Sequence, residues 1–447
     1  ATGAFTTLIG NIGLDAHLVQ PRLELDFEPF KLQLFYVGQV TDLSIDNDIT
    51  LGETLLANFN PSTLAYGHVV DGDFQYNLPK FWDPLLVITG IRARGSWINS
   101  DDALSYDYVT PGSDSYHEPG VSWSEFRAGG FLHLELAPAD WVFITAGGRV
   151  DYDTTAGSFV SPRLAAVFKP IENNYLRLGV ARSFRKPSFQ ESGLHPMLVF
   201  PESGPIQPDE QQDYLEFMAR NIGNPNLEHE QMLAFEAGWR SNWLDGILKT
   251  RLDVYINRAT NIIDFDIKPA FLPTGLPDLE KTSMRFDNEP GAKLAWGVEL
   301  DVRYQPNKNV VLRAGWSYRD TRSETTPKNL FLVGGRFKSE AGLLGSLYLI
   351  GRGEYLGTKI QNPEGLFSPS RRAHLPSVGI FIGRLGYRLR LGNEQKLEIG
   401  AKWYVPVDVE NWRLRYHGRA GLIGPDGTTY GGEPLEPRVT FYLEGWL

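Results

Sequence analysis

Cysteine is absent from this sequence of 447 residues, and so is any long apolar run. Without cysteine, the chain can have no disulfide framework, no thiolate metal site and no cysteine nucleophile. Without a run of about 20 apolar residues, no segment is suited to cross a membrane as a helix. A net charge of −11 also argues against a nucleic-acid partner held by phosphate contacts. These absences leave a soluble protein or a membrane barrel made of strands.

Alternation of polar and apolar residues is the clearest pattern that is present. Within residues 293–304, polar Glu299 and Asp301 alternate with apolar Leu300 and Val302. The same alternation recurs in residues 125–136, 249–257, 313–319, 384–391, 396–403 and 438–447. A period of two predicts strands that present one face to each of two environments.

Strand length and aromatic residues separate a membrane barrel from a soluble sandwich, in which strands also alternate. The longest of these segments, at 125–136, 293–304 and 438–447, run ten residues or more, the length that a tilted strand needs to cross hydrocarbon. Tryptophan and tyrosine end several apolar faces, as in an interfacial girdle. Among them are Tyr152, Tyr175, Trp243, Tyr304, Trp316, Tyr318, Trp403 and Tyr404. In lipid only a closed sheet leaves no unpaired edge, so we predict an all-β, closed, transmembrane antiparallel β-barrel.

The connections alternate between short and long. Short turns are expected at residues 28–30, 137–140, 170–173, 305–308 and 391–394. Long connections are expected near residues 43–66, 99–122, 186–229, 259–290, 357–373 and 405–436. Short periplasmic turns opposite long extracellular loops are typical of outer-membrane barrels, and counting the hairpins predicts about 18 strands, within a range of 16–22. We expect a single barrel domain over residues 1–447.

Charged residues at inward positions are the first candidate site. The lumen-lining candidates are Arg127, Arg149, Arg177, Arg313, Arg352, Arg384, Arg388, Glu299 and Asp301. One interpretation is a polar lumen whose charges select a solute or grip a plug. The other is a set of cross-strand ion pairs that keep the wall rigid and the lumen wet. For any single residue we favour the second interpretation.

An acidic segment is the second candidate, as a calcium site. Asp42, Ser44, Asp46 and Glu53 have the spacing of oxygen ligands in a twelve-residue calcium loop. Asn47 replaces the glycine of the sharp turn, although asparagine tolerates positive φ. A solvated acidic external loop is the alternative that we favour. The eight histidines are scattered, so no zinc or iron site is expected, and calcium is the one cofactor considered.

Four segments resemble the TonB-dependent receptor barrel. Residues 183–191 read Ser-Phe-Arg-Lys-Pro-Ser-Phe-Gln-Glu, residues 223–230 read Gly-Asn-Pro-Asn-Leu-Glu-His-Glu, and residues 235–238 read Phe-Glu-Ala-Gly. Ser-Pro-Arg at 161–163 and Gly-Val-Glu-Leu at 297–300 match further habits of that family in the expected order. The residues that match its motifs are Ser183, Phe184, Arg185, Pro187, Asn224, Pro225, Asn226 and Glu236. The resemblance covers roughly residues 120–447.

The resemblance implies a bacterial outer-membrane protein in the lipid bilayer that binds a scarce, bulky solute and passes it inward. Iron chelates, cobalamin or glycans are the solute classes of the family, and no covalent chemistry is implied. Family members carry an N-terminal plug domain and a TonB box, whereas strand-like patterning here begins near Phe5. We therefore expect gating by a plug not contained in this chain, either cleaved or a separate polypeptide; the alternative is a barrel that has lost energised transport. A TonB-type energy transducer would act through that plug.

Two rival functions remain open. The first is a structural or interaction barrel subunit of a multi-chain envelope complex, occluded by a partner protein. The second is a membrane-embedded hydrolase, for which the sequence has no local nucleophile signature. We expect that the chain is not an enzyme.

Overall fold

The computed structural model describes most of the chain. The residues outside the description are 1, 8–9, 47, 52–53, 60–62, 101–103, 106–121, 194, 197, 200–222, 269, 271, 274–277, 279–280, 322–325, 357–373, 376, 392–394, 409–417, 420–421, 424–428, 431–433, 436 and 447.

One antiparallel sheet of 19 strands forms the wall of the molecule. Its first strands are β1 (Thr2–Thr7), β2 (Gly10–Val19), β3 (Arg22–Phe27), β4 (Phe30–Asp46), β7 (Thr63–Asn77), β8 (Leu85–Ser100), β10 (Ser122–Ala139), β11 (Val142–Asp153), β12 (Gly157–Phe168) and β13 (Asn174–Arg185). The remaining strands are β16 (Glu230–Trp243), β17 (Leu248–Thr260), β20 (Ala292–Asn307), β21 (Val310–Asp320), β22 (Asn329–Lys338), β23 (Leu343–Arg352), β26 (Val378–Arg390), β27 (Lys396–Asp408) and β32 (Arg438–Trp446).

The strand count agrees with the sequence. β2 pairs with residues 38–46 of β4, and β3 pairs with residues 30–35 of the same strand. The two therefore form one strand interrupted before Pro21, where proline offers no amide hydrogen to the sheet. The 19 described strands thus occupy 18 positions around the wall, which confirms the predicted number.

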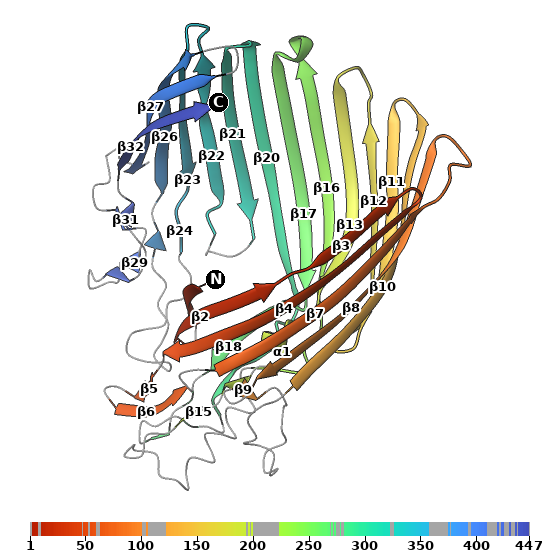
Figure 1. Cartoon of the computed structure of the whole chain (residues 1–447), viewed down its shortest axis with the longest axis vertical. Helices are drawn as coiled ribbons and strands as arrows, with labels where there is room; N and C mark the ends of the chain where they lie inside the picture. The colour runs from red at the N-terminus through yellow and green to blue at the C-terminus, as the bar shows by residue number, and fades with distance from the viewer. Residues whose placement is uncertain are drawn as a thin grey trace.

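Short turns join the strands at one end of the wall, called here the short-turn end, which runs along the top and right of Figure 1. The turns between β3 and β4, β10 and β11, and β20 and β21 each have two residues, at 28–29, 140–141 and 308–309. The connections at the opposite, long-loop end include residues 186–229 between β13 and β16. Short and long connections therefore alternate along most of the wall as the sequence predicted; an exception is the three-residue turn at 154–156 between β11 and β12, which lies at the long-loop end.

Several predicted loops contain further structure. The predicted loop at 259–290 includes a hairpin of β18 (Ile263–Lys268) and β19 (Ser283–Asn288). The other short strands at the long-loop end are β5 (Asp48–Leu51), β6 (Thr54–Phe59), β9 (Leu104–Ser105), β14 (His195–Pro196), β15 (Leu198–Val199), β24 (Tyr355–Leu356), β25 (His374–Leu375), β28 (Gly418–Arg419), β29 (Leu422–Ile423), β30 (Thr429–Tyr430) and β31 (Pro434–Leu435). The helices among the described residues are α1 (Phe189–Gly193) and the 3-10 turn η2 (Leu244–Gly246). No helix in the described part of the chain is long and apolar enough to cross a bilayer.

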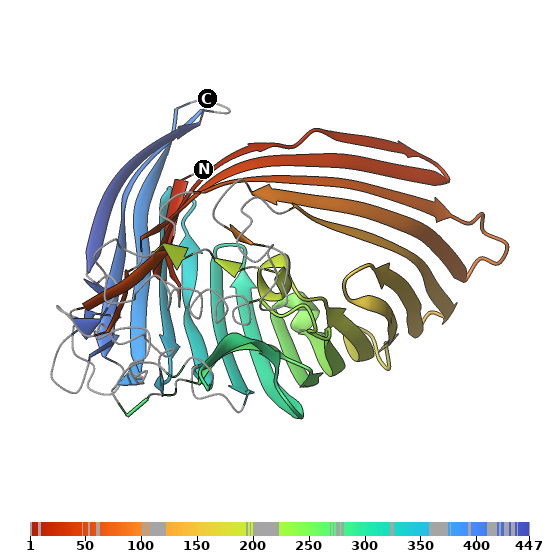
Figure 2. The same cartoon turned by 90° about the horizontal axis from the view of Figure 1, so that it is seen from below.

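The sheet curves round on itself. Figures 1 and 2 show it running from the red N-terminal strands through yellow and green to the blue C-terminal strands. β1 pairs with β2 at one end of the curve, and β27 pairs with β32 at the other. Among the described residues no pairing joins β32 to β1, β2 or β3. The seam that would close the barrel therefore stays a prediction.

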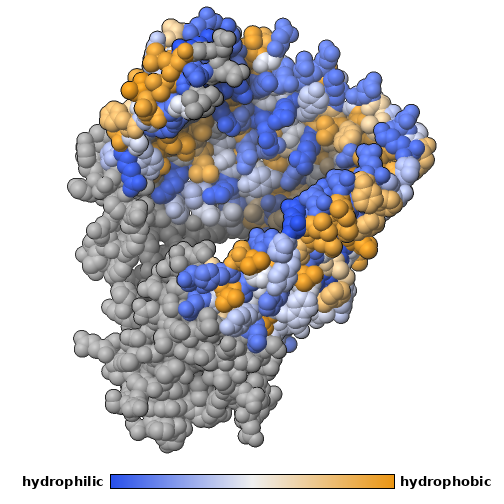
Figure 3. Space-filling model, in the orientation of Figure 1, coloured by the Kyte–Doolittle hydropathy of each residue, from blue (hydrophilic) through white to orange (hydrophobic). Residues whose placement is uncertain are grey.

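The two faces of the wall differ in polarity. The register places large exposed apolar side chains on one face, among them Ile91, Leu132, Val150, Leu164, Leu178, Leu312, Val333, Leu347, Leu385 and Ile399. Figure 3 shows the hydrophilic residues of the far strands on the concave face and hydrophobic patches on the outward face of the near strands. An apolar outer face and a polar inner face are the arrangement of a barrel wall in lipid.

Candidate functional site: the inner wall and the base of the long loop

Arg185 fastens both ends of the loop at residues 186–229. It is the last residue of β13, and its guanidinium donates at 2.6 Å to each carboxylate oxygen of Glu230, the first residue of β16. It also donates to Glu191 in α1, at 2.8 and 3.0 Å. The planar guanidinium suits two bidentate carboxylates, which a lysine cannot reproduce. Arg185 therefore joins the start of the loop to its end; together with its contacts we call this region the loop base.

Glu191 completes the first turn of the loop. Its carboxylate also accepts a hydrogen bond from the Ser188 amide at 2.7 Å. Burial by itself would raise the pKa of Glu191, but the hydrogen bonds from Arg185 and Ser188 outweigh it and hold the pKa below its usual range. Glu191 is therefore charged at neutral pH and available to Arg185.

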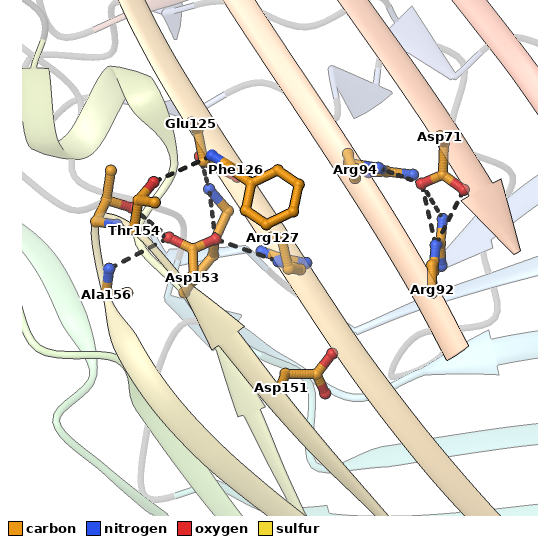
Figure 4. Close-up of polar contacts among 12 residues, drawn as sticks. Asp71, Arg92, Arg94, Glu125, Phe126, Arg127, Asp151, Asp153, Thr154 and Ala156 are labelled. Carbon is orange, nitrogen blue, oxygen red and sulfur yellow. Dashed lines mark hydrogen bonds and ion pairs between the residues drawn. The ribbon is translucent and has the colours of Figure 1, made fainter. Parts of the chain in front are cut away.

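Lys186 links the same loop to two strands of the wall by ion pairs. Its ammonium donates to Glu125 of β10 and lies 3.7 Å from a carboxylate oxygen of Asp153 at the end of β11. Both carboxylates are almost fully buried. Arg127 donates to Asp153 at 3.2 Å, and the amide of Thr155 donates at 2.9 Å, as Figure 4 shows for the surroundings of Asp153. One carboxylate thus organises a wall strand, a tight turn and the loop.

Asn224 organises the return of the loop. Its side-chain amide donates to the Phe286 carbonyl at 2.9 Å and to Asp287 at 3.0 Å, both in β19. Its side-chain oxygen accepts from the Asn226 amide at 3.0 Å, across Pro225. Because an asparagine donates and accepts at once, it can bridge two segments in this way. The Asn-Pro-Asn motif therefore joins the loop to the β18–β19 hairpin.

Phe184 supplies the apolar part of the loop base. Its ring stacks on Phe159 of β12, with centroids 3.8 Å apart, and His229 meets the Phe159 ring edge-on at 4.7 Å. Burial lowers the pKa of His229, so its imidazole is neutral at pH 7. Ser183 precedes Phe184 in β13, and Pro187 follows Lys186 at the start of the loop.

Clustered ion pairs occupy the inner face of the wall. Asp71 of β7 is 1% exposed and accepts from Arg92 at 2.8 and 3.1 Å and from Arg94 at 2.6 Å (Figure 4). Each carboxylate oxygen is bonded, so the buried charge is compensated.

Glu398 of β27 forms the corresponding cluster near the C-terminus. It is fully buried and accepts from Arg384, from Arg388 at 2.7 Å and from the Tyr442 hydroxyl at 2.6 Å. The two arginines are on β26 and the tyrosine is on β32. This cluster therefore links the last three strands of the wall.

The register places all nine lumen-lining candidates on one face, opposite the exposed apolar residues. Their ion pairs are Arg127 with Asp153, Arg149 with Asp151, Arg177 with Glu236, Arg313 with Asp301, and Arg384 and Arg388 with Glu398. Arg352 stacks over the Tyr355 ring at 4.6 Å, and Glu299 lies across from Asp253. The ion pairs fit the interpretation of cross-strand pairs that keep the wall rigid. A role of these residues in solute passage stays a prediction.

Sequence reasoning did not single out Asp71, Arg92, Arg94, Lys186 or Tyr442. Arg92 and Arg94 alternate with apolar residues and carry the same signal as the arginines that were chosen. Lys186 has no such signal, because its partner Glu125 lies 61 residues away and only the folded wall brings the two together.

The calcium candidates have an extended backbone where a calcium loop would turn. Asp42, Ser44 and Asp46 belong to β4, where the backbone pairs with β2. In a strand, alternate residues are about 6.6 Å apart, so these three do not wrap around one ion. Glu53 lies outside the described residues, as do the side chains of Ser44 and Asp46. Calcium binding therefore stays a prediction that the backbone of β4 does not favour.

Comparison with known proteins identifies the family. A family model described as "TonB dependent receptor-like, beta-barrel" matches residues 4–417. Barrels of this family are transport proteins, in agreement with the expectation that the chain is not an enzyme. A search of curated protein sequences gave no match.

Solved structures share the fold at low sequence identity. The siderophore receptor PirA from Acinetobacter baumannii is 13% identical, with a TM-score of 0.64 over 98% of this chain and 63% of that one. The ferric enterobactin receptor PfeA from Pseudomonas aeruginosa is 17% identical, with a TM-score of 0.65 over 97% and 62%. The copper transporter OprC is 14% identical, with a TM-score of 0.58 over 97% and 67%. The chain spans less than two thirds of the length of PirA and PfeA. With the family match over most of its length, the chain belongs to the TonB-dependent receptor β-barrel family of the bacterial outer membrane.

Proposed function

We propose that this chain is the transmembrane wall of an outer-membrane uptake receptor, which binds a solute at its external loops and passes it inward. The observation that carries the proposal is the continuous polar face around 18 strand positions, opposite an apolar face. In a barrel such a face surrounds water, and a wet lumen is a route for a hydrophilic solute. The buried ion pairs of Asp71 and Glu398 keep that route rigid without offering a reactive group.

The solute class is inferred from the structural neighbours. PirA and PfeA are described as a siderophore receptor and a ferric enterobactin receptor, and OprC as a copper transporter. We propose a metal ion or metal chelate for this chain as well.

Gating is proposed to depend on a plug outside residues 1–447, on which a TonB-type transducer acts. The described elements are wall strands and the short strands and helices of their connections, which supports a plug outside them. A lumen enclosed by a wall of 18 strand positions would let small solutes leak if no plug filled it. The loop base supports a binding role for the loops, because Arg185 and Asn224 fix where the loop at 186–229 leaves and rejoins the wall.

Single-channel recording in a planar bilayer tests this function. We expect the purified chain alone to give a large, constant conductance, because no described element fills its lumen. A silent channel that opens when a co-purified protein is stripped away would instead indicate that a partner protein occludes the lumen, either a separate plug or another subunit of an envelope complex. No conductance from folded, inserted and stripped protein would contradict a solute route. A chain that stays in solution without detergent would contradict the membrane wall itself.

A further inference from the structure

Six cationic side chains gather on the inner face at the short-turn end of the wall. We call them the basic patch: Arg240, Lys249, Arg251, Arg303, Arg313 and Arg336. They come from β16, β17, β20, β21 and β22, and they line a hollow of about 1040 Å³. Three carboxylates share this hollow, those of Asp253, Glu299 and Asp301. Cations therefore outnumber anions two to one in a chain whose net charge is −11.

The register sets cations of the basic patch directly opposite one another. Arg240 lies across from Arg251, Lys249 across from Arg303, and Arg303 also across from Arg313 on its other side. Directly opposed residues have Cβ atoms about 4.5–5.5 Å apart, and like charges at that separation destabilise a sheet. Arg303 is therefore flanked by a cation on both sides.

The carboxylates of the hollow do not neutralise the basic patch. Arg251 pairs with Asp253, and Arg313 pairs with Asp301 at 2.8 Å. Arg240, Lys249 and Arg336 make no hydrogen bond or ion pair within the described part of the chain. This differs from the wall near Asp71 and Glu398, where each carboxylate is shared by two arginines.

Arg303 also has an unmet hydrogen-bond donor. One terminal nitrogen donates to Gln305 at 2.8 Å, but its Nε is buried without a partner among the described residues. A buried guanidinium N–H without an acceptor is costly, so an oxygen acceptor placed at this position would bind favourably.

We infer that the basic patch is a binding site for a small oxyanion with several negative charges, such as a polyphosphate or a polycarboxylate. Guanidinium groups bind both kinds of oxygen bidentately, and Lys249 adds a compact charge. A bound oxyanion would reduce the repulsion between the opposed cations and accept a hydrogen bond from Nε of Arg303. The inference rests on the proposed function in one respect, that the polar face encloses water. The basic patch would add an anion-binding site near the short-turn end to the proposed function.

Isothermal titration of the purified chain in detergent, at low ionic strength, tests the inference. Inorganic pyrophosphate is the first probe, and we expect saturable binding that weakens as salt is added. Arg303→Gln and Arg336→Gln should each weaken binding about tenfold, the effect of losing one charge-assisted hydrogen bond. The matched control is Lys308→Gln in the turn between β20 and β21, which removes one cation that is 78% exposed and paired with Glu340. Its affinity should equal that of the unchanged protein.

Thermal unfolding separates a binding role from a structural one. Because Arg303 faces like charges, Arg303→Gln without anion should unfold at the same temperature as the unchanged protein or higher. Pyrophosphate should raise the unfolding temperature of the unchanged protein and, at the same concentration, raise that of this variant less. A lower unfolding temperature for the variant without anion would indicate a structural arginine and contradict the inference.

Citrate distinguishes the two oxyanion sources. Binding of both probes supports a general oxyanion site, and binding of one alone narrows the site to phosphate or to carboxylate. The inference is overturned if neither probe binds, or if Lys308→Gln loses as much affinity as Arg303→Gln. Since these titrations need no membrane, their failure leaves the conductance test of the proposed function unaffected.

Discussion

Replacing Arg185 should release the loop base while the barrel wall stays folded. Arg185 makes hydrogen bonds of 2.6, 2.6, 2.8 and 3.0 Å to two carboxylates, Glu230 and Glu191. A hydrogen bond to a charged group contributes about 1.5–3 kcal/mol. The Arg185 side chain is 45% exposed, so we count two carboxylate pairs at about 1–2 kcal/mol each after allowance for solvent screening. Arg185→Gln should therefore lower the free energy of opening the loop base by about 2–4 kcal/mol.

Hydrogen exchange measured by mass spectrometry in detergent micelles reports this opening. The Ser188 amide bonds to Glu191 at 2.7 Å, and the Ile263 amide bonds to Glu230 at 2.9 Å, so each amide reports on one carboxylate that Arg185 holds. A change of about 2–4 kcal/mol corresponds to exchange roughly 30- to 1000-fold faster at both amides. Amides in the middle of β21 should exchange at their original rate.

Arg177→Gln is the matched control, because it makes the same substitution in the same strand. Arg177 lies 3.3 Å from Glu236, and both side chains are at least half exposed. An exposed pair of this kind contributes less than about 1 kcal/mol, so exchange should change less than about fivefold. The reasoning is refuted if Arg185→Gln leaves the Ser188 and Ile263 amides unchanged, or if all wall strands exchange faster to the same extent.

Three further predictions concern ionisable groups. Lys186→Met should lower the free energy of unfolding by roughly 3 kcal/mol in urea titrations, because it leaves the buried carboxylate of Glu125 without its cationic partner. The double variant with Glu125→Gln should regain part of that loss, and additive losses would contradict the pairing. Glu398→Gln should lower the free energy of opening the last three strands by roughly 3 kcal/mol, because Glu398 links them. A protease should then cleave the C-terminal strands faster, and unchanged cleavage would contradict this role of Glu398. Burial lowers the pKa of His229, so the unfolded loop base binds the proton more readily and stability should fall as the pH drops below about 6.5. Exchange at the loop base should accelerate there, and His229→Phe should remove that acceleration; the same acceleration in the variant would exclude His229 as its source.

Local patterns in the sequence predict several strands of the wall. Residues 293–304 predict β20 (Ala292–Asn307), and residues 249–257 predict β17 (Leu248–Thr260), because alternation is set by neighbours two positions apart. Residues 438–447 likewise predict β32 (Arg438–Trp446). Turn positions follow from proline, asparagine and glycine between the alternating segments.

Contacts between distant segments are not predictable in the same way. The sequence marks Arg185 and Asn224 as motif residues, but it does not show that one holds two glutamates and the other holds β19. The β18–β19 hairpin was missed although Ile263–Lys268 alternates, because each of its strands has six residues, fewer than the roughly ten that a wall strand needs. The opposed cations of the basic patch depend on register, which a one-residue shift would abolish.

Single-cysteine scanning along β20 tests the transmembrane wall most directly, because the chain has no cysteine of its own. Leu300→Cys and Val302→Cys lie on the apolar face, and Glu299→Cys and Asp301→Cys lie on the polar face. After spin labelling in liposomes, we predict that the first pair meets a lipid-soluble quencher and the second pair meets a water-soluble one, in strict alternation. Equal exposure of all four positions to the water-soluble quencher would contradict a wall that separates lipid from a wet lumen.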